Sequence, residues 1–334
     1  MWLNLLVLLG VIIFFLIVPE LVFRIFFSKQ TAFHMDLNQF LESQNLTLTQ
    51  RLSNYSIFRN QSVFRIAIIG DSFMLGVSTE KNISLEDSAV PLLLQKKLDD
   101  AFGVAKYEVL NFGLEGANAL DEFFILKEIT LKYKPDVVVL AVNGNDWNFH
   151  DYNINPFVHC AADGIFSENL FNFLSTRSKL FNYFYMRFQN NNNPSFWLAR
   201  YLSQFNRECL KQSLFRMSAV LSSENITSFA VYIYDIYFPD APPDRTFKEL
   251  DRAEEVAFEI QFFHSCFESA GFTYVDTFPL FMNLTAKEVF ADDHYHFSRK
   301  GNDLIAELVF SYMPENKLLP DCKIINCTKK LIVK

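Results

Sequence analysis

The stretch VFRIAIIGDSF, residues 63–73, decides the fold that we expect for this chain. Its run of β-branched and apolar residues predicts a strand buried on both faces, and Gly70-Asp71-Ser72 predicts a sharp turn directly after it. In open α/β sheets the loops at the carboxyl ends of the strands converge, and ligands bind there. Ser72 is therefore a candidate nucleophile, although an ordinary polar turn that caps the next helix would have the same residues.

Strand and helix patterns alternate along much of the remaining chain. Further strand patterns cover residues 107–112, 136–142, 228–234 and 272–276. Helical patterns cover residues 85–102, 119–133, 207–222, 247–270 and 298–312. This alternation predicts an α/β fold with a parallel sheet and helices on both faces, joined by right-handed crossovers. The aromatic-rich and Asn-rich segment 147–205 interrupts the alternation, so we interpret it as an insertion.

The composition narrows the classes of function. With 334 residues, 50% of them hydrophobic, the chain is long enough to bury a large core. Its net charge is −8 and its 30 Lys and Arg residues are scattered, which argues against a nucleic-acid partner. The five cysteines do not have zinc-site spacing, so we expect no metal site. We also expect no cofactor. Cys322 and Cys327 are either unrelated thiols or the ends of a small disulfide loop.

The N-terminal segment is apolar enough to enter a membrane. Residues 5–18 are uninterrupted by polar side chains, and apolar residues resume up to Phe27 without a small-residue cleavage site. We expect residues 1–27 to form an uncleaved, single-pass membrane anchor, the alternative being a helix buried in the domain. The other expected parts are a polar tether at 28–62, the main domain at 63–315 and a tail at 316–334.

Further candidate catalytic groups follow the later strands. The turn at residues 111–118 contains glycines, which let a backbone N–H approach a ligand closely. Asn145, after the third strand, can direct a side-chain amide toward the same crevice. Asp293 lies three residues before His296, a spacing that lets one loop hold an imidazole and the carboxylate that orients it. A serine with a base and oxyanion donors can attack a carbonyl carbon.

Four segments, in this order, resemble the SGNH/GDSL hydrolase superfamily over about residues 63–313. They are Gly70-Asp71-Ser72, the Asn-x-Gly-x-x-Gly turn of residues 111–116, Asn143-Gly144-Asn145-Asp146, and Asp293-x-x-His296. Each segment alone is common, whereas all four at strand ends or before the last helix are specific. In the third segment Asn143 stands where the family normally has glycine.

The resemblance implies a role for each matching residue. Ser72 would be the nucleophile, His296 the base that takes its proton, and Asp293 the carboxylate that orients His296. The backbone N–H groups of Ser72 and Gly116 and the side-chain amide of Asn145 would stabilise the oxyanion.

The resemblance also implies a flavodoxin-like three-layer α/β/α sandwich with a five-stranded parallel sheet in the order 2-1-3-4-5. The implied activity is hydrolysis of acyl esters, lipase-like or O-acyl esterase, on a small-molecule, lipid or glycan ester. An O-acyltransferase that modifies cell-surface polysaccharide and a catalytically silent glycan- or lipid-binding module remain alternatives. Anchored, exported relatives imply a catalytic domain outside the cytoplasm, whereas Arg24 and Lys29 after the anchor favour the opposite orientation.

Overall fold

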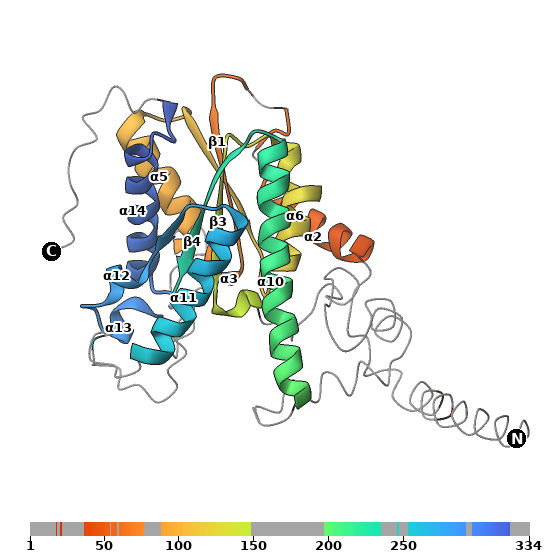
Figure 1. The fold of residues 1–334 in the computed structure, drawn as a ribbon. Helices are drawn as coiled ribbons and strands as arrows, with labels where there is room; N and C mark the ends of the chain where they lie inside the picture. The colour runs from red at the N-terminus through yellow and green to blue at the C-terminus, as the bar shows by residue number, and fades with distance from the viewer. Residues whose placement is uncertain are drawn as a thin grey trace, which may run out of the picture. The chain divides into compact units, whose positions relative to one another are not determined.

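The computed structural model describes residues 37–53, 55–58, 60–76, 88–147, 197–234, 253–291 and 296–320, together with Val18, Leu21 and Thr246 (Figure 1). The chain divides into two compact units, Met1–Phe40 with Phe149–Cys209, and Leu41–Asn148 with Leu210–Lys334. The sheet and the candidate site belong to the second unit. The expected anchor at 1–27 lies almost wholly outside the described residues. Within the described part of the chain, no helix is both long and apolar enough to cross a membrane.

The second unit is built on a five-stranded parallel sheet with the order β2-β1-β3-β4-β5. The strands are β1 (Phe64–Gly70), β2 (Tyr107–Gly113), β3 (Val137–Asn143), β4 (Thr227–Ile233) and β5 (Tyr274–Asp276). Every residue of β3 is buried, as is every residue of β1 after Phe64, because the two strands lie inside the sheet with apolar side chains on both faces. The predicted parallel α/β sheet and its predicted strand order are confirmed.

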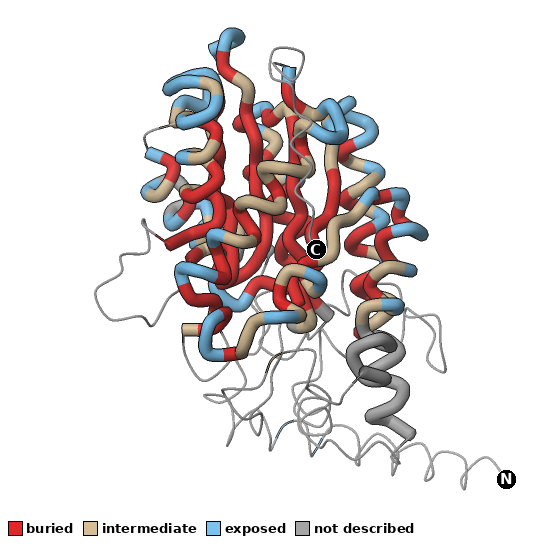
Figure 2. Tube along the Cα trace, turned by 90° about the vertical axis from the view of Figure 1, so that its left-hand side faces the viewer, coloured by how far each residue is buried: buried red, intermediate tan, exposed pale blue. Residues whose placement is uncertain are grey.

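Helices cover both faces of this sheet. Apart from the helix at Leu37–Arg51, the longer ones in the described chain are α5 (Val90–Phe102), α6 (Ala119–Glu128), α10 (Trp197–Ser223), α11 (Ala253–Ala270) and α14 (Arg299–Glu315). Short helices α12 (Phe278–Phe281) and α13 (Ala286–Val289) follow β5. Figure 1 shows α5 and α14 on one face, and α6 and the second half of α10 on the other. Figure 2 shows the buried strands between helices whose outer faces are exposed, as in a three-layer sandwich.

Several helix boundaries differ from the sequence prediction. α5 begins at Val90, later than the predicted residue 85, with Pro91 in its first turn, where a missing N–H costs no hydrogen bond. The helix predicted at 119–133 is divided into α6 and a 3₁₀ helix, η2 (Thr130–Tyr133). α10 begins at Trp197, so the end of the expected insertion is helical. α11 begins at Ala253, and the predicted residues 247–252 lie outside the described chain.

Part of the segment expected to be a polar tether is a helix, α2 (Leu37–Arg51). The sequence predicted no periodicity here because few of its residues are apolar. Leu48 at the end of α2 and Leu52 just after it are nonetheless buried, with 0% and 2% of their surfaces exposed. Arg51 donates hydrogen bonds to the carbonyl oxygens of Asn111 and Gly113 at the end of β2. The end of α2 is therefore packed on the domain.

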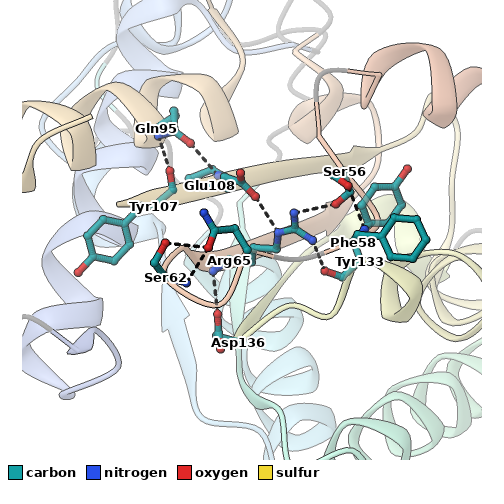
Figure 3. Close-up of polar contacts among 11 residues, drawn as sticks. Ser56, Phe58, Ser62, Arg65, Gln95, Tyr107, Glu108, Tyr133 and Asp136 are labelled. Carbon is teal, nitrogen blue, oxygen red and sulfur yellow. Dashed lines mark hydrogen bonds and ion pairs between the residues drawn. The ribbon is translucent and has the colours of Figure 1, made fainter. Parts of the chain in front are cut away.

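The amino ends of the central strands are held together by a buried arginine, Arg65 of β1, which is 1% exposed (Figure 3). Its Nε donates to Glu108 of β2 at 2.7 Å. The two terminal nitrogens donate to the carbonyl oxygens of Tyr133 at 2.8 Å and Ser56 at 2.7 Å. The backbone N–H of Arg65 donates to Asp136 at 2.8 Å. One guanidinium thus joins strands β1 and β2, the end of η2 and the loop at Ser56.

Candidate active site

Ser72 lies directly after β1, at the carboxyl edge of the sheet. It begins the one-turn helix α3 (Ser72–Leu75), which Asp71 caps by accepting a hydrogen bond from the Phe73 backbone N–H at 3.0 Å. Gly76 ends the helix in the left-handed region, with φ 88°. Ser72 is 6% exposed, so its hydroxyl sits in a largely enclosed position. The sharp turn predicted from Gly-Asp-Ser is confirmed.

His296 comes from the other end of the chain and lies against Ser72. Its Nε2 is 3.3 Å from the Ser72 Oγ, within hydrogen-bonding distance. The rings of Phe73 and His296 are 5.9 Å apart between centroids, and Phe73 also packs on Phe297 at 4.8 Å. Ser72 and His296 are 224 positions apart in the sequence, and the fold brings this predicted nucleophile and this predicted base together.

The loop that carries His296 is closed by backbone hydrogen bonds. The Ala291 N–H donates to the His296 carbonyl oxygen and the Ser298 N–H to the Val289 carbonyl oxygen, both at 2.8 Å. Ser298 then caps α14 by accepting from the Gly301 N–H at 3.2 Å. A side chain at Gly301 would collide with the Val289 carbonyl oxygen, so glycine permits this close approach. These hydrogen bonds therefore fix the backbone at and after His296, and with it the place from which the imidazole extends.

The glycine turn after β2 lies beside α3. Gly70 and Gly113 are paired in the sheet, and the Leu114 N–H donates to the Gly70 carbonyl oxygen at 3.0 Å. A Cβ atom at Gly113 would overlap the backbone of Met74 and Leu75, so this strand end packs directly on the helix that begins with Ser72. Gly116 has φ 66°, a left-handed conformation that favours glycine. Its assignment as an oxyanion donor remains a prediction.

The third predicted segment follows β3 as the 3₁₀ helix η3 (Gly144–Trp147), which contains Asn145. The side chain of Asn145 lies outside the described atoms, so its role remains a prediction. Asp146 of η3 closes the turn between β3 and this helix. Its Oδ2 accepts a hydrogen bond from the backbone N–H of Asn143 at 2.6 Å. Asn143 is buried as the last residue of β3.

Asp293, the predicted orienting acid, falls with residues 292–295 outside the described chain. The structure therefore tests neither its distance to His296 nor the predicted triad as a whole. Ser72 and His296 are the pair that the described residues bring together.

Sequence reasoning missed one buried acid near this edge, Glu122 in the first turn of α6. It is 1% exposed, and neither of its carboxylate oxygens has a hydrogen-bond partner among the described residues. Burial, and secondarily the negative charges of Asp71 and Asp121, raise the pKa of Glu122 well above its ordinary value. The available signal was a pair of adjacent acidic residues, Asp121 and Glu122, within the otherwise apolar stretch ALDEFFIL.

No family model matches the chain, and no curated protein matches it. Solved structures do match. The lipase/acylhydrolase from Enterococcus faecalis has 17% identity and a TM-score of 0.46, covering 77% of this chain and 98% of its own. An esterase from a Pseudoalteromonas species has 13% identity and a TM-score of 0.44, covering 76% and 98%. An acetylxylan esterase from Geobacillus stearothermophilus has 14% identity and a TM-score of 0.44, covering 75% and 94%. The fold assignment itself rests on the observed strand order and register.

Proposed function

We propose that this protein is a serine-dependent acyl-ester hydrolase in which Ser72 is the nucleophile and His296 the general base. The observation that carries the proposal is the 3.3 Å separation between the Ser72 Oγ and the His296 Nε2. A neutral imidazole at this distance can accept the hydroxyl proton while the oxygen attacks a carbonyl. The four motif segments found in the sequence support the same chemistry.

The reaction has two steps. The Ser72 oxygen bonds to the ester carbonyl carbon, His296 takes the hydroxyl proton, and the tetrahedral intermediate expels the alcohol, which receives that proton. Water then attacks the acyl-enzyme with His296 again as base, releasing the acid and restoring Ser72. In this proposal Asp293 orients His296 and stabilises its charged form.

The oxyanion requires donors that are already in place. The Ser72 N–H begins α3, where the first backbone N–H groups have no intrahelical acceptor. We assign the second donor to the Gly116 N–H and the third to the Asn145 side-chain amide. Such preorganised donors stabilise the developing negative charge more than water does.

Hydrolysis of p-nitrophenyl esters of increasing acyl length tests the proposal. We expect the full-length protein in detergent to release p-nitrophenolate, and Ser72→Ala to abolish that release. No release by the wild-type protein, or release that survives in Ser72→Ala, would contradict it. Adding a sugar acceptor separates the alternatives, because a transferase would move the acyl group to the sugar rather than to water.

We further propose that residues 1–27 anchor the protein and that its catalytic domain lies outside the cytoplasm, facing acylated glycans or lipids. Cys209 of α10 takes part in a disulfide bond, and disulfides persist mainly in oxidising compartments. The sequence had directed attention instead to Cys322 and Cys327, which lie outside the described residues. Protease added to intact cells should digest the domain, whereas protection of the domain would reverse the orientation.

A further inference from the structure

Glu122 is a buried acid without the partners that buried carboxylates normally have. Both of its carboxylate oxygens lack a hydrogen bond within the part of the chain that the structure describes, although the residue is 1% exposed. An isolated charge in a protein interior is costly unless it is paired or strongly hydrogen-bonded. The position therefore suits a neutral carboxylic acid better than a carboxylate.

The charges that act on Glu122 are negative. Besides burial, which is the largest cause, the charges of Asp71 in the turn after β1 and of Asp121 in the same helix raise the pKa of Glu122. The N-terminus of α6 would favour a negative charge, but Asn118 and Asp121 already form its capping box. Arg51 and His296, basic groups at this edge, are hydrogen-bonded to backbone carbonyls of β2 and to Ser72 respectively. Among the described groups that shift its pKa, none is a cation.

Asp71 links Glu122 to the nucleophile. The Asp71 Oδ1 accepts from the Phe73 N–H at 3.0 Å and caps the single turn of α3. Ser72 lies between these two residues in the sequence, so movement of the Asp71 cap would move the nucleophile. When both are ionised, the carboxylates of Glu122 and Asp71 repel each other. This repulsion would disturb the hydrogen bond from the Phe73 N–H to Asp71.

We propose that Glu122 is a positioning residue that keeps its proton during catalysis, and that its ionisation at alkaline pH displaces Asp71 and with it Ser72. The inference rests on the proposed function in so far as Ser72 is the nucleophile. Ionisation of Glu122 would make the activity fall at high pH, which gives the pH profile an alkaline limb. A general base alone would give no such limb, because a base that has lost its proton stays active as the pH rises.

The first test is the pH dependence of fluorophosphonate labelling between about pH 6 and about pH 10. We expect the labelling rate of the wild-type protein to fall at the alkaline end. In Glu122→Gln, which has the same shape and no charge to gain, the fall should move up by at least about one pH unit or disappear. Glu128→Gln, in the last turn of the same helix and with a side chain that is 40% exposed, is the matched control and should keep the wild-type profile. An unmoved alkaline limb in Glu122→Gln would overturn the positioning role.

The second test, urea unfolding across the same range, does not depend on activity. Because the pKa of Glu122 is raised in the folded protein above its ordinary value of 4.5, its contribution to stability is present at low pH and is lost as the pH rises. The free energy of unfolding of the wild-type protein should therefore fall with pH relative to that of Glu122→Gln. Parallel curves would overturn the inference, even if the wild-type protein is never labelled and the proposed function has failed.

Discussion

The two ends of the parallel sheet each contain a buried ionisable side chain, and their surroundings differ. At the amino ends, Arg65 has a hydrogen-bond acceptor for each of its three nitrogens, including the carboxylate of Glu108 (Figure 3). At the carboxyl ends, Glu122 has no hydrogen-bond partner in the described chain, and Ser72 and His296 are brought together at 3.3 Å.

The difference indicates a division between stability and activity. A fully hydrogen-bonded guanidinium holds strands and loops in place, and removing it would leave a carboxylate and two carbonyl oxygens without their donor. Polar groups without partners are expected where a protein gives up stability for chemistry. Substitutions at the amino ends of the strands should therefore lower mainly the free energy of unfolding. Substitutions at the carboxyl ends should lower mainly the catalytic rate.

The largest effect should come from the reacting pair. We expect Ser72→Ala and His296→Ala each to lower kcat by about a millionfold, and the double variant to be little worse, because the two residues act as one unit. Their free energies of unfolding should stay close to that of the wild-type protein. Steady-state kinetics on a p-nitrophenyl ester checks this, and losses that multiply in the double variant would contradict a shared role.

Arg65→Ala should have the largest effect on stability. It leaves the carbonyl oxygens of Tyr133 and Ser56 and the partly exposed carboxylate of Glu108 without their donor, which should cost about 2–4 kcal/mol in total, and urea unfolding measures the loss. Lys97→Ala is the matched control, because Lys97 pairs with Asp303 and Glu307 near the surface, where such pairs contribute about 0–1 kcal/mol. The Arg65 variant should keep its activity per folded molecule. Equal losses of stability in the two variants would remove the distinction between the sheet ends.

Asn145→Ala should lower kcat by about a hundredfold to a thousandfold, the usual loss for one oxyanion donor. Asn145→Asp, which keeps the size but replaces the amide donor with a carboxylate, should lose at least as much. The fraction folded, followed by circular dichroism, should not change in either variant. Full activity in Asn145→Asp would exclude the amide as a donor.

Arg51→Ala should have the smallest effect. It removes charged hydrogen bonds to the carbonyl oxygens of Asn111 and Gly113, which contribute about 1–3 kcal/mol in general, and its partial exposure favours the lower part of this range. Arg51→Lys should recover part of the loss, since one ammonium can still reach one carbonyl. Urea unfolding measures both variants, and an unchanged midpoint in Arg51→Ala would mean that α2 does not stabilise the end of β2.

The sheet could be predicted from the sequence because its central strands are buried on both faces. Such strands are continuous apolar runs, as in β1 and β3, and the five predicted strands agree with the observed ones within about two residues at each end. Helix ends were less predictable. α2 was missed because its burial depends on a few leucines, and the early start of α10 lies in a segment without clear periodicity.

The site could be predicted only in part. Ser72 and His296 were identifiable from short motifs, but their separation of 3.3 Å is a property of the folded chain. Glu122 was not identified, because two acids in the first turn of a helix are ordinary in a sequence, and the burial of Glu122 without a partner is known only from the folded chain. Arg65 likewise looks like an isolated polar residue in an apolar strand until its acceptors on separate segments come together.

The most direct test of the central claim is to locate the adduct of a fluorophosphonate by peptide mass spectrometry. The account predicts one adduct, on the Ser72 oxygen, which is absent in Ser72→Ala and forms far more slowly in His296→Ala. An adduct on another residue, or one that persists in Ser72→Ala, would contradict Ser72 as the nucleophile.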